Sequence, residues 1–330
     1  MENNLENTKI TCEICPRNCK LSVGQFGFCK TRFSNGEKIT SQTDGYTSGF
    51  AIDPIEKKPL YHFYPTSTAL SFGTFGCNMG CNFCQNYNIS KIGFQKQYAT
   101  KATPEQIVNT ALAHGCKSIA YTYNDPIITL EYTTKTAKIA KENGVKNVAV
   151  TAGYISEKYW QEFFENIDGA NIDLKAFSED FYKKNCLAHI SPVLETIKYV
   201  WHDTPVELEL TTLLIPQEND SFDELKREFD WITNNLSTDV PVHLSAFHPS
   251  YKMLQKPRTD VQTIINAYNI AKEFELKYVY SGNIIDNLTS TTSCPKCKLK
   301  LIERAGYNVK ILTENPSICP NCGEKIYGRF

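Results

Sequence analysis

The chain has 330 residues, 13 cysteines and a formal net charge of -1. This length allows one large α/β domain of roughly 200 to 250 residues with small appendages, and leaves too little chain for a second full domain. The balanced charge excludes a broadly basic surface, so we do not expect nucleic acid as the main partner.

The apolar runs and the first residues argue against a membrane protein and a secreted one. No apolar run reaches the length of a membrane span, and the start MENNLENTKI is too polar for a secretory signal. We therefore expect a cytoplasmic protein, in a reducing compartment where disulfides are rare. Eleven of the cysteines form clusters of four, three and four, which indicates metal ligands.

The first cluster lies in a segment, residues 1–68, that has no strong helical or strand periodicity. Its members are Cys12, Cys15, Cys19 and Cys29. Four thiolates can complete either a tetrahedral zinc site or an Fe-S cluster, and the spacing does not choose between them, although we favour the Fe-S cluster. Free structural cysteines are a third alternative. The nearby His62 has apolar neighbours and is expected to be a packed, hydrogen-bonded histidine without a catalytic role.

The second cluster, Cys77, Cys81 and Cys84, lies in a loop after the predicted strand 69–75. Three thiolates this close in sequence can hold three irons of a 4Fe-4S cluster, and the loop offers no fourth sulfur. The fourth iron is then open to a small chelating ligand, and the aromatic Phe83 can cover the flat base of such a ligand. A zinc site completed by a ligand from elsewhere is the alternative.

From Ala69 to about Asn287, short apolar runs alternate with amphipathic stretches, which predicts βα units and a parallel sheet. The predicted strands are 69–75, 117–123, 147–151, 170–177, 206–216, 241–249 and 277–282. The predicted helices are 104–115, capped by Thr103, then 127–143, 222–235 and 261–274. These six or seven units predict an incomplete barrel within residues 69–290, with its chemistry at the carboxyl ends of the strands.

Polar side chains stand at these strand ends, although strands buried on both faces should be almost entirely apolar. They are Asn124, Asp125, Thr151, Asp173, Lys175, Thr211, Thr212 and His248. Asp173 and Lys175 are two residues apart, so they face one side of the strand and can pair with each other at the rim or with a zwitterionic ligand. Asp125 fits a turn before Pro126 equally well, and His248 fits a packed histidine at the rim.

The third cluster follows the predicted core, in residues 291–330. Its two C-x2-C pairs are Cys294, Cys297, Cys319 and Cys322. This spacing is a strong four-thiolate metal signal, and 40 residues cannot bury a self-sufficient core, so metal binding must supply much of the folding energy. We expect a zinc-ribbon or rubredoxin-like segment, with zinc favoured over iron. Of the two isolated cysteines, Cys116 is expected in the core, whereas Cys186 could face the site.

Several stretches together resemble the radical SAM enzymes. The pattern of Cys77, Cys81 and Cys84 matches their signature, in which the open iron binds the amino and carboxylate groups of S-adenosylmethionine (SAM). YTYNDP, NIDLK and FHP at the strand ends are similar to enzymes of the pyruvate formate-lyase activating type. With CEICPRNC, CNMGCNFCQNYNIS, ELTTLLIP, SAFHPSYKM, CPKC and CPNCG, the whole chain is similar to the AmmeMemoRadiSam system radical SAM enzymes.

The resemblance implies a partial TIM barrel, (β/α)6, with a 4Fe-4S cluster and SAM as cofactors. It implies that Tyr123-Asn124-Asp125-Pro126 takes the place of a Gly-Gly-Glu motif that receives the SAM amino group, and that Asp173, Lys175 and His248 lie near SAM. Thr151 follows the next strand at the same edge. One departure is Val150, where activating enzymes typically have an aspartate, and it weakens the case for a glycyl-radical partner.

The expected activity is reductive cleavage of SAM to methionine and a 5′-deoxyadenosyl radical, which abstracts a hydrogen atom from an unidentified substrate. The alternatives are a glycyl-radical enzyme activase and a non-catalytic metal-binding scaffold. The expected partners are a low-potential electron donor of the flavodoxin or ferredoxin type, and the Memo-like and AMMECR-like proteins that the resemblance implies. A second cluster at the N-terminal cysteines could relay electrons or bind substrate.

Overall fold

The computed structural model describes residues 9–284 and 289–330. Its central sheet has eight strands in the order β14-β13-β12-β11-β10-β9-β7-β6, and neighbouring strands run parallel except at the β6-β7 edge. The strands are β6 (Phe50–Pro54), β7 (Thr68–Phe72), β9 (Ser118–Tyr121), β10 (Lys146–Thr151), β11 (Gly169–Asp173), β12 (Glu207–Leu214), β13 (Val242–Ala246) and β14 (Val279–Gly282). The predicted parallel sheet is therefore confirmed.

Helices connect the parallel strands. The longer ones are α2 (Pro104–Ala113), α3 (Leu130–Glu142), α4 (Trp160–Phe164), α6 (Ser191–Asp203), α7 (Phe222–Asn235) and α8 (Val261–Glu273). Single turns are α1 (Tyr87–Ser90), α5 (Glu179–Phe181), the 3-10 turns η2 (Ile55–Lys57), η3 (Lys96–Tyr98), η4 (Pro126–Thr129) and η5 (Glu157–Tyr159), and the π-helix η6 (Tyr182–Cys186). Among the described residues, no helix is both long and apolar enough to cross a membrane.

The predicted boundaries hold best where a cap or a glycine defines them. Thr103 and Gln106 form a capping box at the start of α2, with Pro104 at the first helical position, as expected. Five strands end earlier than predicted: β7 at Phe72, β9 at Tyr121, β11 at Asp173, β12 at Leu214 and β13 at Ala246. Beyond β13 the amide of Phe247 donates to the Thr259 hydroxyl at 2.8 Å, so the chain leaves the ladder before the expected end at residue 249.

Strand β6 was not predicted, because its sequence FAIDP carries an aspartate and a proline, which are both rare in strands. At the edge of the sheet these residues are tolerated. The Asp53 carboxylate accepts from Lys57, Lys58 and the Tyr123 hydroxyl at 2.7, 2.7 and 2.8 Å. These partners hold the pKa of Asp53 below its usual value although burial opposes them.

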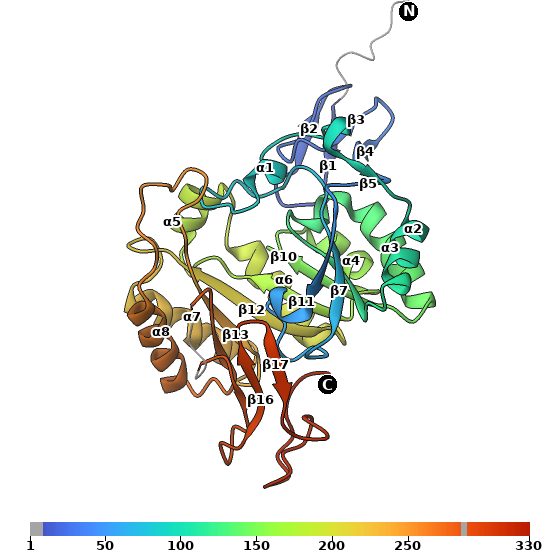
Figure 1. Ribbon diagram of the computed structural model, residues 1–330. Coiled ribbons are helices and arrows are strands. Elements are labelled where there is room, and N and C mark those ends of the chain that lie inside the picture. The colour runs from blue at the N-terminus through green and yellow to red at the C-terminus, as the bar shows by residue number, and fades with distance from the viewer. Residues whose placement is uncertain (1–8, 285–288) are drawn as a thin grey trace, which may run out of the picture.

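The N-terminal cysteine segment folds into small antiparallel pairs at one end of the sheet, beside α1 (Figure 1). Its strands are β1 (Ile10–Cys12), β2 (Cys19–Leu21), β3 (Arg32–Ser34), β4 (Ile39–Ser41) and β5 (Tyr46–Thr47), the last paired with β8 (Thr100–Lys101). The buried Arg32 anchors the segment to α3, since its guanidinium donates two 2.7 Å hydrogen bonds to the Glu131 carboxylate. Of the predicted segment 1–68, residues 1–8 lie outside the described part.

The C-terminal cysteine segment lies at the opposite end of the sheet (Figure 1). Its strands β15 (Thr292–Ser293), β16 (Lys300–Ala305) and β17 (Asn308–Ile311) form an antiparallel sheet. The fully buried Arg304 donates to the carbonyl of Tyr61 at 2.7 Å and to the Thr292 hydroxyl at 2.7 Å. Residues 285–288, near the predicted boundary at residue 290, lie outside the described part.

His62 is confirmed as a packed, hydrogen-bonded histidine. It is completely buried beneath the C-terminal segment, and its ring nitrogens contact the Tyr327 carbonyl at 2.5 Å and the Tyr280 hydroxyl at 2.6 Å. Burial lowers its pKa to about 4, so the ring is neutral at pH 7.

A buried carboxyl between β12 and α7 gives a pH-dependent prediction. Glu228 is 1% exposed and accepts from the Thr212 hydroxyl at 2.5 Å. Burial raises its pKa from 4.5 to about 8. The folded chain therefore keeps a proton that the unfolded chain loses between these values, so this group's contribution to stability falls as pH rises from about 4.5 to about 8.

We expect Glu228→Gln to remove this loss, because the amide keeps the shape of the protonated carboxyl and does not titrate. The Tm of the variant relative to wild type should rise steadily between pH 5 and pH 8 in thermal unfolding experiments. The exposed Glu273→Gln, at the end of α8, is the control and should show a constant difference. A Tm difference for Glu228→Gln that does not change with pH would contradict the prediction.

Candidate active site

The three cysteines of the central loop meet in one cavity. Cys77, Cys81 and Cys84 line a cavity of about 160 Å³ at the carboxyl ends of β9, β10 and β11. The predicted strand-end residues that line it too are Asn124, Asp125, Thr151, Asp173 and Lys175. The rule that parallel strands gather their chemistry at one edge thus brings together residues up to about a hundred positions apart.

The loop is held in place by side-chain and backbone hydrogen bonds from neighbouring strand ends. The Asn124 side chain accepts from the Thr74 amide at 2.8 Å and donates to the Thr74 hydroxyl and the Gly76 carbonyl, both at 2.9 Å. The Gly80 amide donates to the carbonyl of Cys186 at 2.7 Å. A Cβ on Gly80 would come within 2.7 Å of Leu187, so this close approach requires glycine. Asn124 therefore acts in this structure as a positioning residue for the cysteine loop.

The electrostatic surroundings of the thiols are uneven. Burial, together with the nearby Asp125 carboxyl, raises the pKa of Cys77 to about 12. A hydrogen bond with Cys186, helped by Lys175 and Lys91, lowers the pKa of Cys81. Metal ligation requires thiolates, so binding must displace the proton of Cys77. The two lysines line the same cavity and offset part of the negative charge that three thiolates would bring.

Hydrogen bonds to sulfur are a further feature of the loop. The Met79 amide donates to the Cys77 sulfur at 3.3 Å, and the Cys84 sulfur lies 3.0 Å from the Ser90 hydroxyl. Such bonds are among the means by which proteins tune Fe-S potentials. Three thiols that are buried or partly buried, with hydrogen-bonded sulfurs and two nearby cations, fit the requirements of a 4Fe-4S cluster ligated by three cysteines.

The sequence did not decide whether Cys186 faces the site, and the structure places it beside Cys81. It is completely buried at the end of the π-helix η6, in hydrogen-bonding contact with Cys81. Burial raises its pKa well above the ordinary value, so it is a thiol beside a more acidic neighbour. A π-turn is itself a common mark of functional sites, but its position was not readable from the sequence. The other isolated cysteine, Cys116, is buried as expected.

Asp125 and Thr151 contact each other. The Thr151 hydroxyl donates to both Asp125 oxygens, at 3.0 and 3.2 Å, and the Ala152 amide donates to one of them at 2.9 Å. Asp125 also accepts from the Ile127 amide at 3.1 Å, which caps η4 and agrees with the turn interpretation. Burial nevertheless raises its pKa above the usual value.

Asp173 and Lys175 form the ion pair that their spacing allowed, with 2.9 Å between the Lys175 ammonium and the Asp173 carboxylate. Burial alone would lower the pKa of Lys175, but the negative charges of Asp173 and Cys81 outweigh it and raise the pKa well above its ordinary value. The ammonium lies 6.0 Å from the centre of the Phe83 ring. Phe83 is almost fully buried and packs against Phe181.

A second cavity, of about 240 Å³, adjoins the first. The two share the lining residues Cys81, Cys84, Asn86, Tyr123, Asp173 and Lys175. The second cavity is also lined by Phe83 and Thr211, and the buried Thr211 hydroxyl has no hydrogen-bond partner. A buried hydroxyl without a partner at a cavity wall is a ready contact for a polar ligand.

Ser245 and Asn283 line the second cavity and were not among the predicted site residues. Both stand at or just beyond a strand end, in SAFHP and YVYSGN, so the rule that identified Thr211 could have found them. His248 is half-buried and lines neither of these two cavities.

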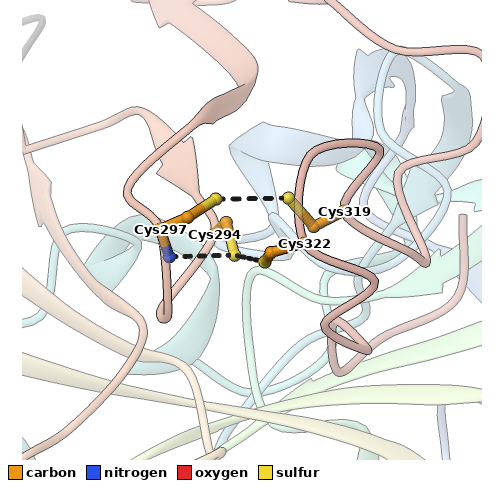
Figure 2. Close-up of side chains that lie close together, drawn as sticks. All are labelled: Cys294, Cys297, Cys319 and Cys322. Carbon is orange, nitrogen blue, oxygen red and sulfur yellow. Dashed lines mark hydrogen bonds between the residues drawn. The ribbon is translucent and has the colours of Figure 1, made fainter.

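The C-terminal cysteines form a compact four-sulfur group (Figure 2). Its members are Cys294, Cys297, Cys319 and Cys322. The Sγ atoms lie within 4.8 Å of one another, and the pairs Cys294 with Cys322 and Cys297 with Cys319 are 3.5 Å apart. On a tetrahedron with Zn-S bonds of 2.3 Å, neighbouring sulfurs are about 3.8 Å apart. This geometry fits a single zinc ion.

The N-terminal cysteines also gather, but less tightly. Cys12 and Cys19 are cross-strand partners in the β1-β2 pair. Cys12, Cys15 and Cys29 are buried, and Cys19 is partly exposed. Burial raises the pKa of Cys15 to about 12, and the other three thiols each raise it further by charge repulsion, which places all four in one electrostatic neighbourhood.

Comparisons with known proteins agree with this geometry. A family model described as the radical SAM superfamily matches residues 72–232. The uncharacterised protein MJ0808 of Methanocaldococcus jannaschii is 40% identical over 324 residues, covering 98% of this chain and 96% of that protein.

Two solved structures share the fold at low sequence identity. A radical SAM methyltransferase from Sphaerobacter thermophilus aligns with a TM-score of 0.51 at 17% identity, over 66% of this chain and 67% of that one. SuiB from Streptococcus suis, bound to S-adenosylmethionine, aligns with a TM-score of 0.51 at 12% identity, over 69% of this chain and 53% of that one.

Proposed function

We propose that this chain, whose residues 72–232 match the radical SAM superfamily model, is an enzyme that cleaves SAM reductively and abstracts hydrogen from a substrate. The observation that carries this proposal is the shared cavity of Cys77, Cys81 and Cys84, which also receives the polar ends of three strands. We further propose that the open sheet is the partial (β/α)6 barrel expected from the sequence.

The cysteines would hold a 4Fe-4S cluster, with the second cavity as the place of SAM. When bound, the reduced cluster and SAM supply a one-electron cleavage that gives methionine and a 5′-deoxyadenosyl radical. Phe83 and Thr211 line the second cavity, where the ring offers an apolar face and the unpaired hydroxyl offers a polar contact. Asp173 and Lys175 stand between the two cavities and can exchange part of their mutual pairing for the carboxylate and amino groups of SAM.

The remaining assignments are proposals from the resemblance. Asn124, Asp125, Thr151 and His248 are proposed near SAM, although Asn124 also positions the cysteine loop. Zinc is proposed at the C-terminal cysteines, and the cytoplasm as the compartment. Memo-like and AMMECR-like proteins, and a low-potential donor of the flavodoxin or ferredoxin type, are proposed partners. Val150 lines the site cavity where a glycyl-radical activase typically has an aspartate, so we do not favour an activase.

The test is anaerobic reconstitution of the protein with iron and sulfide, followed by an assay for 5′-deoxyadenosine from SAM under dithionite. We expect product that depends on both SAM and reductant. If the iron-loaded protein releases no 5′-deoxyadenosine under these conditions, the catalytic proposal fails and a metal-binding scaffold becomes the better description.

A substitution of Lys175 tests its proposed role toward SAM. We expect Lys175→Met to weaken equilibrium binding of SAM to the reconstituted protein by about 10- to 100-fold, because a hydrogen bond to a charged group contributes about 1.5 to 3 kcal/mol. The surface variant Lys198→Met, which loses an ordinary helix ion pair with Glu195, is the matched control and should bind like wild type. Wild-type affinity in Lys175→Met would show that the lysine serves only Asp173.

A further inference from the structure

The three cysteine groups differ in how closely their sulfurs approach. Among the described residues, one group of three or more metal-binding side chains has all its ligand atoms within 4.8 Å, and it is the C-terminal four. The central cysteines, whose pattern is typical of a 4Fe-4S cluster, are spaced more widely than this. In a cubic cluster each thiolate binds a different iron, so the sulfurs stay farther apart than around a single ion.

The N-terminal four, like the central three, are not part of the compact group that was found among the described residues. No three of the thiols of Cys12, Cys15, Cys19 and Cys29 satisfy the 4.8 Å limit, within the part of the chain that the structure describes. Cys12 and Cys19 are nevertheless cross-strand partners, a Cβ on Gly27 would lie 3.6 Å from the Cys19 sulfur, and three of the four cysteines are buried. The Arg32 amide donates to the Cys29 sulfur at 3.4 Å, a bond of the kind that the central loop also makes. These features match those of the central loop, so we take an Fe-S cluster as the group for these residues.

The N-terminal loop lies directly against the central cysteine loop. A Cβ on Gly76, the residue before Cys77, would lie 2.0 Å from the carbonyl oxygen of Cys29, so the two backbones are in contact. Gly76 has φ of +82°, and the Thr31 hydroxyl donates to the Phe75 carbonyl at 2.5 Å. Cys29 and Cys77 are proposed ligands of different sites. They are connected through one van der Waals contact, between the Cys29 carbonyl and Gly76, and the peptide bond from Gly76 to Cys77.

A second bridge joins the same two loops. Arg17 lies between the ligands Cys15 and Cys19, and its Nε donates to the carbonyl of Asn78 at 2.5 Å. Its Nη2 donates to the carbonyl of Leu187, beside Cys186. The guanidinium also stacks on Phe28, 3.5 Å from the ring centre. A fixed cation therefore lies between the two cysteine loops, where it offsets negative charge on both sides.

Four thiolates occupy all four irons of a cubic cluster, so a cluster here has no open iron for a substrate or for SAM. Such a centre can still accept and donate single electrons. Cys19 is the partly exposed ligand, whereas Cys29 faces the central loop. An electron could therefore enter from solvent at the Cys19 side and leave toward the central loop at the Cys29 side.

We propose that Cys12, Cys15, Cys19 and Cys29 hold a second 4Fe-4S cluster that relays electrons to the cluster at Cys77, Cys81 and Cys84. The relay rests on the proposed function, whereas the identity of the N-terminal centre does not. A low-potential one-electron donor protein is oxidised by one electron, the N-terminal cluster is reduced and reoxidised, and the central cluster gains that electron. No bond forms or breaks in this step, and no proton needs to move.

Iron and sulfide counts test the identity of the centre. We expect about eight irons and eight sulfides in reconstituted wild type, and about four of each in a variant with Cys77, Cys81 and Cys84 all changed to alanine. Adding Cys12→Ala and Cys15→Ala should remove the rest. Wild type with about four irons, all lost in the triple variant, would overturn the second cluster. Wild type with about four irons, all kept there, would sink the proposed function instead.

Electron paramagnetic resonance tests the relay without relying on turnover. In the fully reduced wild type, two clusters this close should couple magnetically, so that its spectrum is broader than the sum of the two single-cluster variants. A spectrum equal to that sum would overturn the placement. In Cys12→Ala/Cys15→Ala, the rate at which reduced flavodoxin reduces the central cluster, followed optically, should fall by at least an order of magnitude. An unchanged rate would overturn the relay.

Discussion

Replacing Cys81 with alanine is expected to abolish SAM cleavage, with 5′-deoxyadenosine falling to the level of a sample without protein. Cys81 is the most deeply buried of the three loop cysteines and the one whose pKa its surroundings lower. With two thiolates left, the loop cannot hold three irons of a 4Fe-4S cluster. The loss should appear both in the product, measured chromatographically, and in the iron count, measured on the same sample.

The matched control is Cys116→Ala, a cysteine that is equally buried, at 6% exposure, and lies outside the three clusters after α2. This variant should keep wild-type iron and product, apart from a small loss of stability. If Cys81→Ala retained wild-type product, the central loop would not be the catalytic site, whatever the metal content of the rest of the chain.

Cys319→Ala is expected to lower the Tm of the whole protein by about 10 °C or more and to remove its zinc. Structural zinc sites contribute on the order of 10 kcal/mol to folding. The net effect on stability is smaller, because the cysteines of the unfolded chain also bind metal. Cys319 is 1% exposed, and its segment packs on Tyr278 and Tyr280 of the main sheet. Loss of the metal therefore exposes apolar surface beyond the segment itself.

Zinc content by mass spectrometry and Tm by calorimetry check this expectation. Ser317→Ala, two residues away and not a metal ligand, should keep both values, and chelation of wild-type zinc should reproduce the Tm of Cys319→Ala. A Tm within about 2 °C of wild type, a change worth less than about 1 kcal/mol, would mean that the segment folds without metal.

The sequence predicted the repeated βα units well, because buried parallel strands and amphipathic helices leave strong periodic patterns. Helix α7 was predicted with both ends correct, since Ser221 caps it and the stripe of buried side chains is regular. The C-terminal four-cysteine group was readable from spacing alone. Strand β6 was missed because its pairing at a sheet edge overrides the poor strand preference of Asp53 and Pro54.

The candidate site was readable as a set of strand ends but not as a set of contacts. The parallel topology was enough to place Asp125, Thr151 and Asp173 around one loop. Whether a polar side chain at a strand end is free or already hydrogen-bonded depends on which residues surround it in the fold. Sequence periodicity does not specify those residues. Asn124 is used by the cysteine loop, and Cys186 reaches the site through a π-turn whose extra residue has no sequence signature.

The part of the C-terminal cysteine segment that covers His62, around Arg329, sets an order of events during synthesis. The Arg329 amide donates to the His62 carbonyl at 2.7 Å, and the Tyr64 amide donates back to the Arg329 carbonyl at 2.6 Å. These contacts join positions more than 260 residues apart. Until the ribosome has made the C-terminal cysteine segment, one end of the sheet stays uncovered, and His62, Tyr278 and Tyr280 are open to water or to chaperones. This end of the sheet therefore closes only after the segment that contains Arg329 has been made.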